Sequence, residues 1–172
     1  MDAGRALLYQ TARYVDIYKA LDDIARERKL TPEERQEQKK YAKLADSFTP
    51  LAKGMNSEYA NQNAYDCIQI HGGSGFMMEY ACQRIYRDAR ITSIYEGTTQ
   101  LQTVAAIRYV TNGSYIATIR EFEAIPCSPE MEPLMSRLKK MADKFEASTN
   151  AVVRTKGRGY QTERAGFVRP NT

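Results

Sequence analysis

One carboxylate, Glu96, stands in an unusual setting within the segment I-T-S-I-Y-E-G-T-T-Q, residues 91–100. Taken alone, it is best explained as a charge at a helix start, where N–H groups and the dipole stabilise an anion by about 0.3–1 kcal/mol. The alternative is a catalytic base. Ile94 and Tyr95 would shield it from water, and burial raises the pKa of a carboxyl group, which suits it to removing a carbon-bound proton. Gly97 favours this alternative, because it lets another molecule approach the backbone closely.

A glycine run, H-G-G-S-G at residues 71–75, invites comparison with phosphate-binding loops. The dinucleotide pattern G-x-G-x-x-G would need a glycine where Met78 stands, and it would follow a strand. A helical pattern precedes the run here. We therefore interpret the glycines as a helix stop, in which they allow a left-handed terminal turn.

The single histidine and the three cysteines are the remaining candidates for metal or nucleophile chemistry. His71 has no cysteine or aspartate at triad or metal-ligand spacing, so a capping or hydrogen-bonding role is favoured. Cys67, Cys82 and Cys127 form no C-x-x-C pair and are odd in number. The sequence therefore predicts neither a disulfide framework nor a metal site, and it fits a reducing cytoplasm.

Composition and charge limit the class of protein. A chain of 172 residues with 42% hydrophobic residues can bury one core and carry appendages. The whole excess of basic over acidic residues, a net charge of +4, lies in residues 150–172. We expect this basic tail to be loosely ordered rather than to be an arm that binds nucleic acid. No run approaches the roughly 18 apolar residues of a membrane span, and the N-terminus lacks signal-peptide features. We expect a soluble, cytoplasmic protein.

Helical periodicity runs through the chain, and no alternating strand pattern competes with it. The first helix ends in a charged stretch, and T-P-E-E predicts the next start, with Thr31 as cap and Glu34 closing a capping box. Residues 26–40 should form the solvent-exposed tip of a helical hairpin. Pro50 predicts a kink or restart, so a third helix is expected from about 51 to 70, with an amide-rich side that faces something polar.

The second half of the chain shows shorter helices. We expect them over about 80–89, from Thr98 to T-N-G, over 115–125, and after Ser128, which would cap the last helix. Four charged residues of the 80–90 region have spacing suited to structural ion pairs: Arg84, Arg87, Asp88 and Arg90. The predicted fold class is all-α, an antiparallel four-helix bundle with extra C-terminal helices.

Two motifs carry a family resemblance. Q-I-H-G-G-S-G-F-M-M-E-Y at 69–80 and R-I-Y-R-D-A-R-I-T-S-I-Y-E-G-T-T-Q-L-Q at 84–102 closely resemble the C-terminal helical domain of acyl-CoA dehydrogenases. The N-terminal A-G-R-A-L-L-Y-Q-T-A-R is similar to the opening helix of that domain.

The resemblance also divides the chain. Residues 1–112 look like the bundle domain, and the stretch 26–43 looks like an insertion of the larger, long-chain-type branch. Residues 113–149 resemble the helices that such larger members append, and 150–172 are a basic tail that we expect to be disordered.

The resemblance implies an activity, which is α,β-dehydrogenation of acyl-CoA thioesters with FAD as cofactor, as in fatty acid β-oxidation. Glu96 matches the base that removes the α-proton while hydride leaves to FAD, and Gly97 matches a substrate-contacting position. The family pattern implies cofactor contacts at five positions: Gln69, Gly72, Gly73, Thr98 and Gln100. It also implies a homo-oligomer, dimer or tetramer, because one subunit lends its Q-x-x-G-G run to the flavin of its neighbour, and it implies an electron-transfer flavoprotein as electron acceptor.

The departures from the family are as informative as the matches. Family members also have an N-terminal helical domain and a middle β-domain that hold much of the flavin, and neither is present in this sequence. We therefore expect a fragment that is inactive alone and binds FAD weakly or not at all. Two alternatives stay open: a non-catalytic helical scaffold for oligomerisation, and a relative of the acyl-CoA oxidases.

Overall fold

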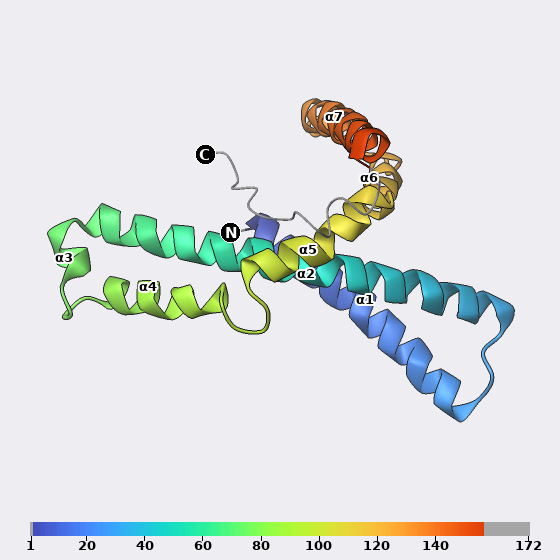
Figure 1. Ribbon diagram of the computed structural model, residues 1–172, viewed down its shortest axis with the longest axis horizontal. Helices are drawn as coiled ribbons and strands as arrows, with labels where there is room; N and C mark the ends of the chain where they lie inside the picture. The colour runs from blue at the N-terminus through green and yellow to red at the C-terminus, as the bar shows by residue number, and fades with distance from the viewer. Residues whose placement is uncertain (1, 157–172) are drawn as a thin grey trace. The chain divides into compact units, whose positions relative to one another are not determined.

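The computed structural model describes residues 2–156, and all regular secondary structure in this range is helical (Figure 1). The helices are α1 (Asp2–Glu27), α2 (Pro32–His71), α3 (Gly73–Phe76), α4 (Ala81–Thr92), α5 (Thr99–Thr111), α6 (Ser114–Glu123) and α7 (Glu132–Lys156). The predicted all-α class is confirmed. The chain divides into two compact units, one up to Thr103 and one from Val104 on, so the boundary falls within α5.

The hairpin between α1 and α2 forms as its local sequence predicts. The Thr31 hydroxyl accepts a hydrogen bond from the Glu34 N–H (3.2 Å), and the Glu34 carboxylate accepts one from the Thr31 N–H (2.9 Å), which completes the capping box. Arg28 donates to both Glu34 carboxylate oxygens, at 2.6 and 2.8 Å. These hydrogen bonds, that of Arg28 first and that of Thr31 second, lower the pKa of Glu34 to about 2.

The long helix α2 corrects the predicted restart at Pro50 and the separate helix expected from about 51. A proline within a helix removes one backbone hydrogen bond and costs roughly 3 kcal/mol, yet α2 neither stops nor restarts there. Pro50 is buried, and the Tyr14 ring of α1 packs edge-on against Phe48 of α2 with centroids 5.2 Å apart. Packing against α1 therefore outweighs the local cost of the proline.

Two helices run antiparallel to α2 along different stretches, α1 beside its first part and α4 beside its last part (Figure 1). The buried face of α2 consists largely of small side chains, which let neighbouring helices approach closely: Ala45, Ser47, Ala52, Ser57 and Ala64. On the α4 side, Tyr65 and Tyr86 meet edge-to-face with centroids 6.3 Å apart. Asn61 donates hydrogen bonds to the carbonyls of Ser57 (2.8 Å) and Ala89 (3.1 Å) and so joins α2 to α4.

In the second unit, α6 packs against α7 through one arginine. Arg120 donates to Glu123 on its own helix and to Asp143 and Glu146 on α7, with nearest distances of 2.7–2.8 Å. Tyr115 is buried in this unit, and the loss of water raises its pKa to about 12.

The start of α7 differs from the prediction. Ser128 does not cap the helix, because residues 129–131 first form a turn and the helix begins at Glu132, with Pro133 in its first turn. At its other end α7 continues to Lys156, so the first residues of the predicted tail are helical. The rest of the tail, 157–172, lies outside the described residues.

Candidate active site

The turn between α4 and α5 holds Glu96 in an unusual backbone conformation. Its φ of 53° is left-handed, and Glu96 is the one non-glycine residue with positive φ among the residues that the structure describes. Gly97 follows with φ of 92°, where glycine carries no penalty. A left-handed non-glycine residue costs about 1–3 kcal/mol and persists only when surrounding contacts impose it.

Those contacts come from two side chains that bind the backbone of the turn. Lys53 of α2 donates from Nζ to the carbonyl of Gly97 at 2.6 Å, and Gln102 of α5 donates from Nε2 to the carbonyl of Glu96 at 3.1 Å. The same Gln102 amide lies 3.4 Å from the Gly97 carbonyl. The Lys53 ammonium also lies 5.9 Å from the centre of the Tyr95 ring. The turn is thus held by its carbonyls, and the Glu96 side chain takes no part in holding it.

The start of α5 is fixed by two threonines. The Thr98 hydroxyl accepts a hydrogen bond from the Leu101 N–H at 3.4 Å, as expected of a cap. Thr99 donates from Oγ1 to the Glu58 carboxylate of α2 at 2.5 Å. The segment that follows Gly97 is therefore anchored both within α5 and to α2.

The Glu96 carboxylate itself is exposed, and it makes no hydrogen bond or ion pair with any residue of 2–156. Ile94 is 46% exposed and Tyr95 50% exposed, so the expected shielding of the carboxylate by these two residues is wrong within this chain. The physical reason is that α4 ends at Thr92, and the side chains of α2 and α5 that contact the following turn bind its backbone carbonyls and leave the carboxylate uncovered. Any shielding of Glu96 has to come from another domain or subunit.

A shallow, open depression of about 480 Å³ lies beside this turn, lined by Tyr86, Arg87, Arg90, Ile91 and Ile94. The ion pairs predicted for the arginines of this region are wrong: among the described residues, Arg84, Arg87 and Asp88 make none. Arg90 instead donates to the Ser93 hydroxyl. On a short helix with exposed side chains, water solvates such charges about as well as a partner does.

The second group of predicted site residues lies at the other end of α4. Gln69 is exposed in the last turn of α2, Gly72 is exposed in the turn that follows, and Gly73 is the exposed first residue of α3. A side chain at either glycine would meet nothing within 4 Å. Because α4 has 12 residues at a rise of about 1.5 Å each, its length separates this group from the Glu96–Gln100 group.

Comparison with known families shows which family the chain resembles. The sequence profile described as "Acyl-CoA dehydrogenase, C-terminal domain" matches residues 2–110, which is most of the chain. The chain belongs to the acyl-CoA dehydrogenase family. A second profile, "Acyl-CoA dehydrogenase C terminal", matches residues 111–164 of this family member. The resemblance inferred from the two motifs is therefore confirmed.

Individual relatives agree. The chain is 41% identical over 64 residues, 37% of its length, to an acyl-CoA dehydrogenase of Bacillus subtilis (strain 168), of which 17% is covered. It is 46% identical over 59 residues, 34% of its length, to the mitochondrial long-chain specific acyl-CoA dehydrogenase of Sus scrofa, of which 14% is covered. It is 37% identical over 101 residues, 59% of its length, to the 3-methylmercaptopropionyl-CoA dehydrogenase of Ruegeria pomeroyi, of which 15% is covered.

The acyl-CoA dehydrogenase homologues are thus much longer proteins, and the matched part is less than a fifth of each. No solved structure gives a significant match to the chain. Over residues 2–156, no helix combines the length and the apolar character that crossing a membrane requires.

Two residues that position the turn, Lys53 and Gln102, were not predicted as site residues. Gln102 is the last residue of the motif that contains Glu96, and its place in that motif could have identified it as a site residue. Lys53 stands 44 positions before the Gly97 carbonyl that it binds, and no local pattern connects the two. The prediction that His71 has no cysteine partner is also wrong, as described below.

Proposed function

We propose that this chain is the base-bearing C-terminal domain of an FAD-dependent acyl-CoA dehydrogenase, with Glu96 as the base. The observation that carries the proposal is the left-handed backbone of Glu96, held by Lys53 and Gln102 while the carboxylate stays unengaged. Residues with strained backbone cluster at functional sites, where surrounding contacts hold them in place. A charge that merely capped α5 would need no such conformation, since Thr98 already caps that helix.

The proposed chemistry follows from the position of the carboxylate. Glu96 takes the proton from the α-carbon of a bound acyl-CoA thioester, and the C–H electron pair forms the α,β double bond as the β-hydrogen leaves with its own pair. When bound, FAD accepts that hydride. The backbone N–H of Glu96 points from the same turn and would hydrogen-bond the thioester carbonyl, stabilising the enolate-like transition state. The missing side chain of Gly97 leaves room for the Gln102 amide, whose nitrogen a Cβ would meet at 2.6 Å, and so lets Gln102 hold the turn.

The exposed residues of the two ends of α4 suit the flavin. Thr98 and Gln100 offer a hydroxyl and an amide at the α5 start, and Gln69 offers an amide next to the open backbone of Gly72 and Gly73. The hydroxyl and amide side chains can hydrogen-bond the diphosphate and ribityl parts of a dinucleotide. The two glycines let it approach closely, although the N–H and C=O of Gly72 are engaged with Gln69 and Gly75. The separation of the two groups by the length of α4 supports a site that spans two protomers.

Exposed apolar side chains support the same arrangement. Ile70 is 83% exposed, Phe76 77% and Met78 86%, all around the α2–α3 turn. Apolar surface of this kind is usually covered by another protein surface. We therefore propose that the chain works as a homo-oligomer together with flavin-binding domains, and that its reduced flavin passes electrons to an electron-transfer flavoprotein.

The test is Glu96→Gln in the complete polypeptide, purified with any subunit that supplies the flavin-binding domains. The variant should keep its bound flavin. Anaerobic bleaching of the flavin by acyl-CoA should slow by roughly 10²–10⁴-fold, the effect typical of losing a general base. Glu37→Gln, which removes an exposed carboxylate from the hairpin tip, should bleach at the wild-type rate. Normal bleaching in Glu96→Gln would exclude Glu96 as the base. Absence of flavin in every preparation would favour a non-catalytic scaffold, and rapid oxygen consumption would favour an oxidase.

A further inference from the structure

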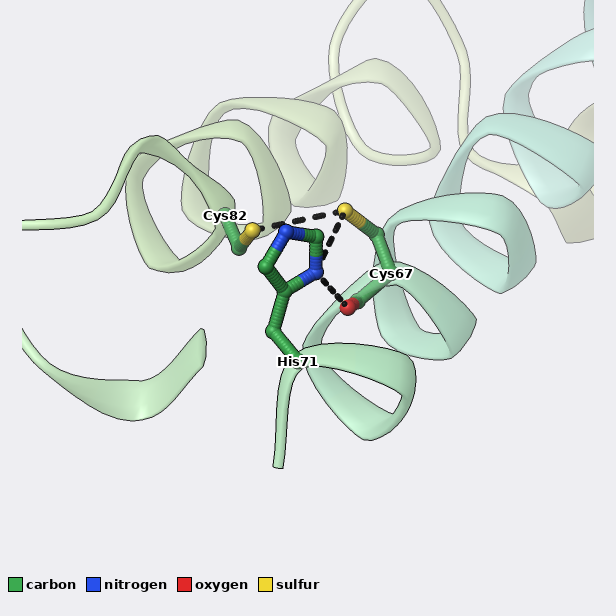
Figure 2. Close-up of side chains that lie close together, drawn as sticks. All are labelled: Cys67, His71 and Cys82. Atoms are coloured by element: carbon green, nitrogen blue, oxygen red, sulfur yellow. Dashed lines mark hydrogen bonds between the residues drawn. The ribbon is translucent and has the colours of Figure 1, made fainter. Parts of the chain in front are cut away.

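Three side chains that the sequence separates meet at the junction of α2 and α4. The thiols of Cys67 and Cys82 and the imidazole of His71 point toward one another (Figure 2). One ligand atom from each lies within 4.8 Å of the others. The sulfurs are 3.4 Å apart, and Cys67 Sγ lies 3.9 Å from His71 Nδ1. The sequence analysis found no cysteine at metal-ligand spacing from His71, and the structure places two cysteine sulfurs within reach of its ring.

Helix geometry explains the meeting. Cys67 and His71 are four residues apart on α2, which places them on the same face one turn apart. Gly72, with φ of 60°, then ends the helix, and α4 begins at Ala81 with Cys82 buried in its first turn. The three donors thus come from one helix end and from the start of the helix packed against it.

Gly75 of α3 makes this close return possible. A side chain there would lie 2.7 Å from the Ile68 carbonyl oxygen and 2.9 Å from Cβ of His71, so only glycine fits without a shift. The short α3 therefore packs directly against the helix turn that carries Cys67 and His71. The contact restrains the base of the His71 side chain.

The hydrogen bond of His71 determines which ring nitrogen is available. Nδ1 lies 2.8 Å from the Cys67 carbonyl oxygen, which can only accept, so Nδ1 carries the proton. The lone pair of the neutral ring is therefore on Nε2. Metal-binding histidines characteristically donate their other N–H to a carbonyl or carboxylate, which orients the ring and strengthens the ligand.

The spacing of the sulfurs fits a shared metal ion better than a disulfide. A tetrahedral ion with bonds of about 2.3 Å to sulfur places two sulfurs about 3.8 Å apart. The observed 3.4 Å is close to this value, whereas a disulfide requires about 2.05 Å. Thiolates with an imidazole are also the donor set that zinc prefers, since soft sulfur ligands select it over magnesium or calcium.

The thiol of Cys67 donates a hydrogen bond to the sulfur of Cys82 at 3.4 Å. A bound divalent cation replaces this hydrogen bond, because each thiol then releases its proton to solvent and its sulfur binds as thiolate. Three protein donors leave one position of a tetrahedral ion open. His71 is exposed, so water can reach that position.

We propose that Cys67, His71 and Cys82 form a binding site for a zinc-type divalent cation, with water as the fourth ligand. The ion would tie the C-terminal turn of α2 to the first turn of α4, and it would hold the glycine turn between them. This role is structural and does not depend on catalysis by Glu96.

The test uses the full chain, reduced and freed of metal, titrated with Co²⁺ as a spectroscopic probe and with Zn²⁺ in competition. One equivalent of Co²⁺ should bind and produce thiolate-to-metal charge transfer together with the intense visible bands of tetrahedral cobalt. Cys82→Ser and His71→Ala should weaken binding by more than the roughly 10–100-fold typical of losing an outer-shell partner. The matched control is Cys127→Ser, which removes an exposed cysteine outside the cluster and should bind like wild type.

A second measurement avoids variants that fail to fold. Zn²⁺ should protect Cys67 and Cys82 of the wild-type chain from alkylation and leave Cys127 reactive, as read by mass spectrometry of the labelled peptides. Octahedral cobalt spectra without charge transfer, equal labelling of all three cysteines with and without Zn²⁺, or loss of binding in Cys127→Ser would each overturn the proposal.

Discussion

The left-handed backbone of Glu96 leads to a prediction in which stability and activity move in opposite directions. Glycine adopts φ of 53° freely, whereas any residue with a Cβ is strained there. Replacing Glu96 by glycine should therefore stabilise the fold, and replacing it by alanine should not. Both changes remove the carboxylate, so the two variants differ only in the Cβ atom.

The magnitude follows from two opposing contributions. Relief of the left-handed strain is worth about 1–3 kcal/mol. Glycine also makes the unfolded chain more flexible, which offsets about 0.5–1 kcal/mol of that gain. We expect Glu96→Gly to exceed Glu96→Ala in unfolding free energy by about 1 kcal/mol, which for a chain of this size raises Tm by about 2–4 °C.

The assay is thermal and urea unfolding followed by circular dichroism. Glu37, exposed within α2, provides a control of opposite sign. There, glycine should be less stable than alanine by about 1 kcal/mol, since the backbone is helical. If Glu96→Gly proves no more stable than Glu96→Ala while the Glu37 pair behaves as stated, the turn is not held in the left-handed region and its link to function is refuted. In the complete enzyme, the more stable Glu96→Gly should still lose bleaching by acyl-CoA.

Two further predictions concern the scaffold. Gly75→Ala should lower the unfolding free energy by about 1–3 kcal/mol, because its Cβ would lie 2.7 Å from the Ile68 carbonyl oxygen. Gly73→Ala is the control and should not lower it, because a Cβ there meets nothing within 4 Å. Equal stability of the two variants in urea unfolding would show that α3 is not packed as described. At the hairpin, the hydrogen bond from Arg28 is the main cause that lowers the pKa of Glu34 from 4.5 to about 2. The ionised Glu34 carboxylate therefore stabilises the folded state fully above pH 4.5, and this stabilisation is lost as pH falls through about 2. The Tm difference between wild type and Glu34→Gln should therefore shrink over that interval, and a difference independent of pH would contradict this.

Much of the fold was predictable because it depends on short-range chemistry. The capping box at Thr31 and the cap at Thr98 connect residues three positions apart, and apolar periodicity marks the helices around them. The motif that contains Glu96 is contiguous in the chain, which is why the family could be inferred from it. In such segments the side chains and the backbone groups that they satisfy are neighbours in the sequence.

Only the tertiary structure decided the rest. Pro50 looks like a helix break until the packing of Tyr14 on Phe48 is known, and Lys53 reaches the Gly97 carbonyl across 44 positions. Cys67 and Cys82 are 15 positions apart, and they meet because α4 folds back along α2. The physical reason is common to all three. Local rules determine each helix, but the register in which one helix packs on another determines which distant side chains meet.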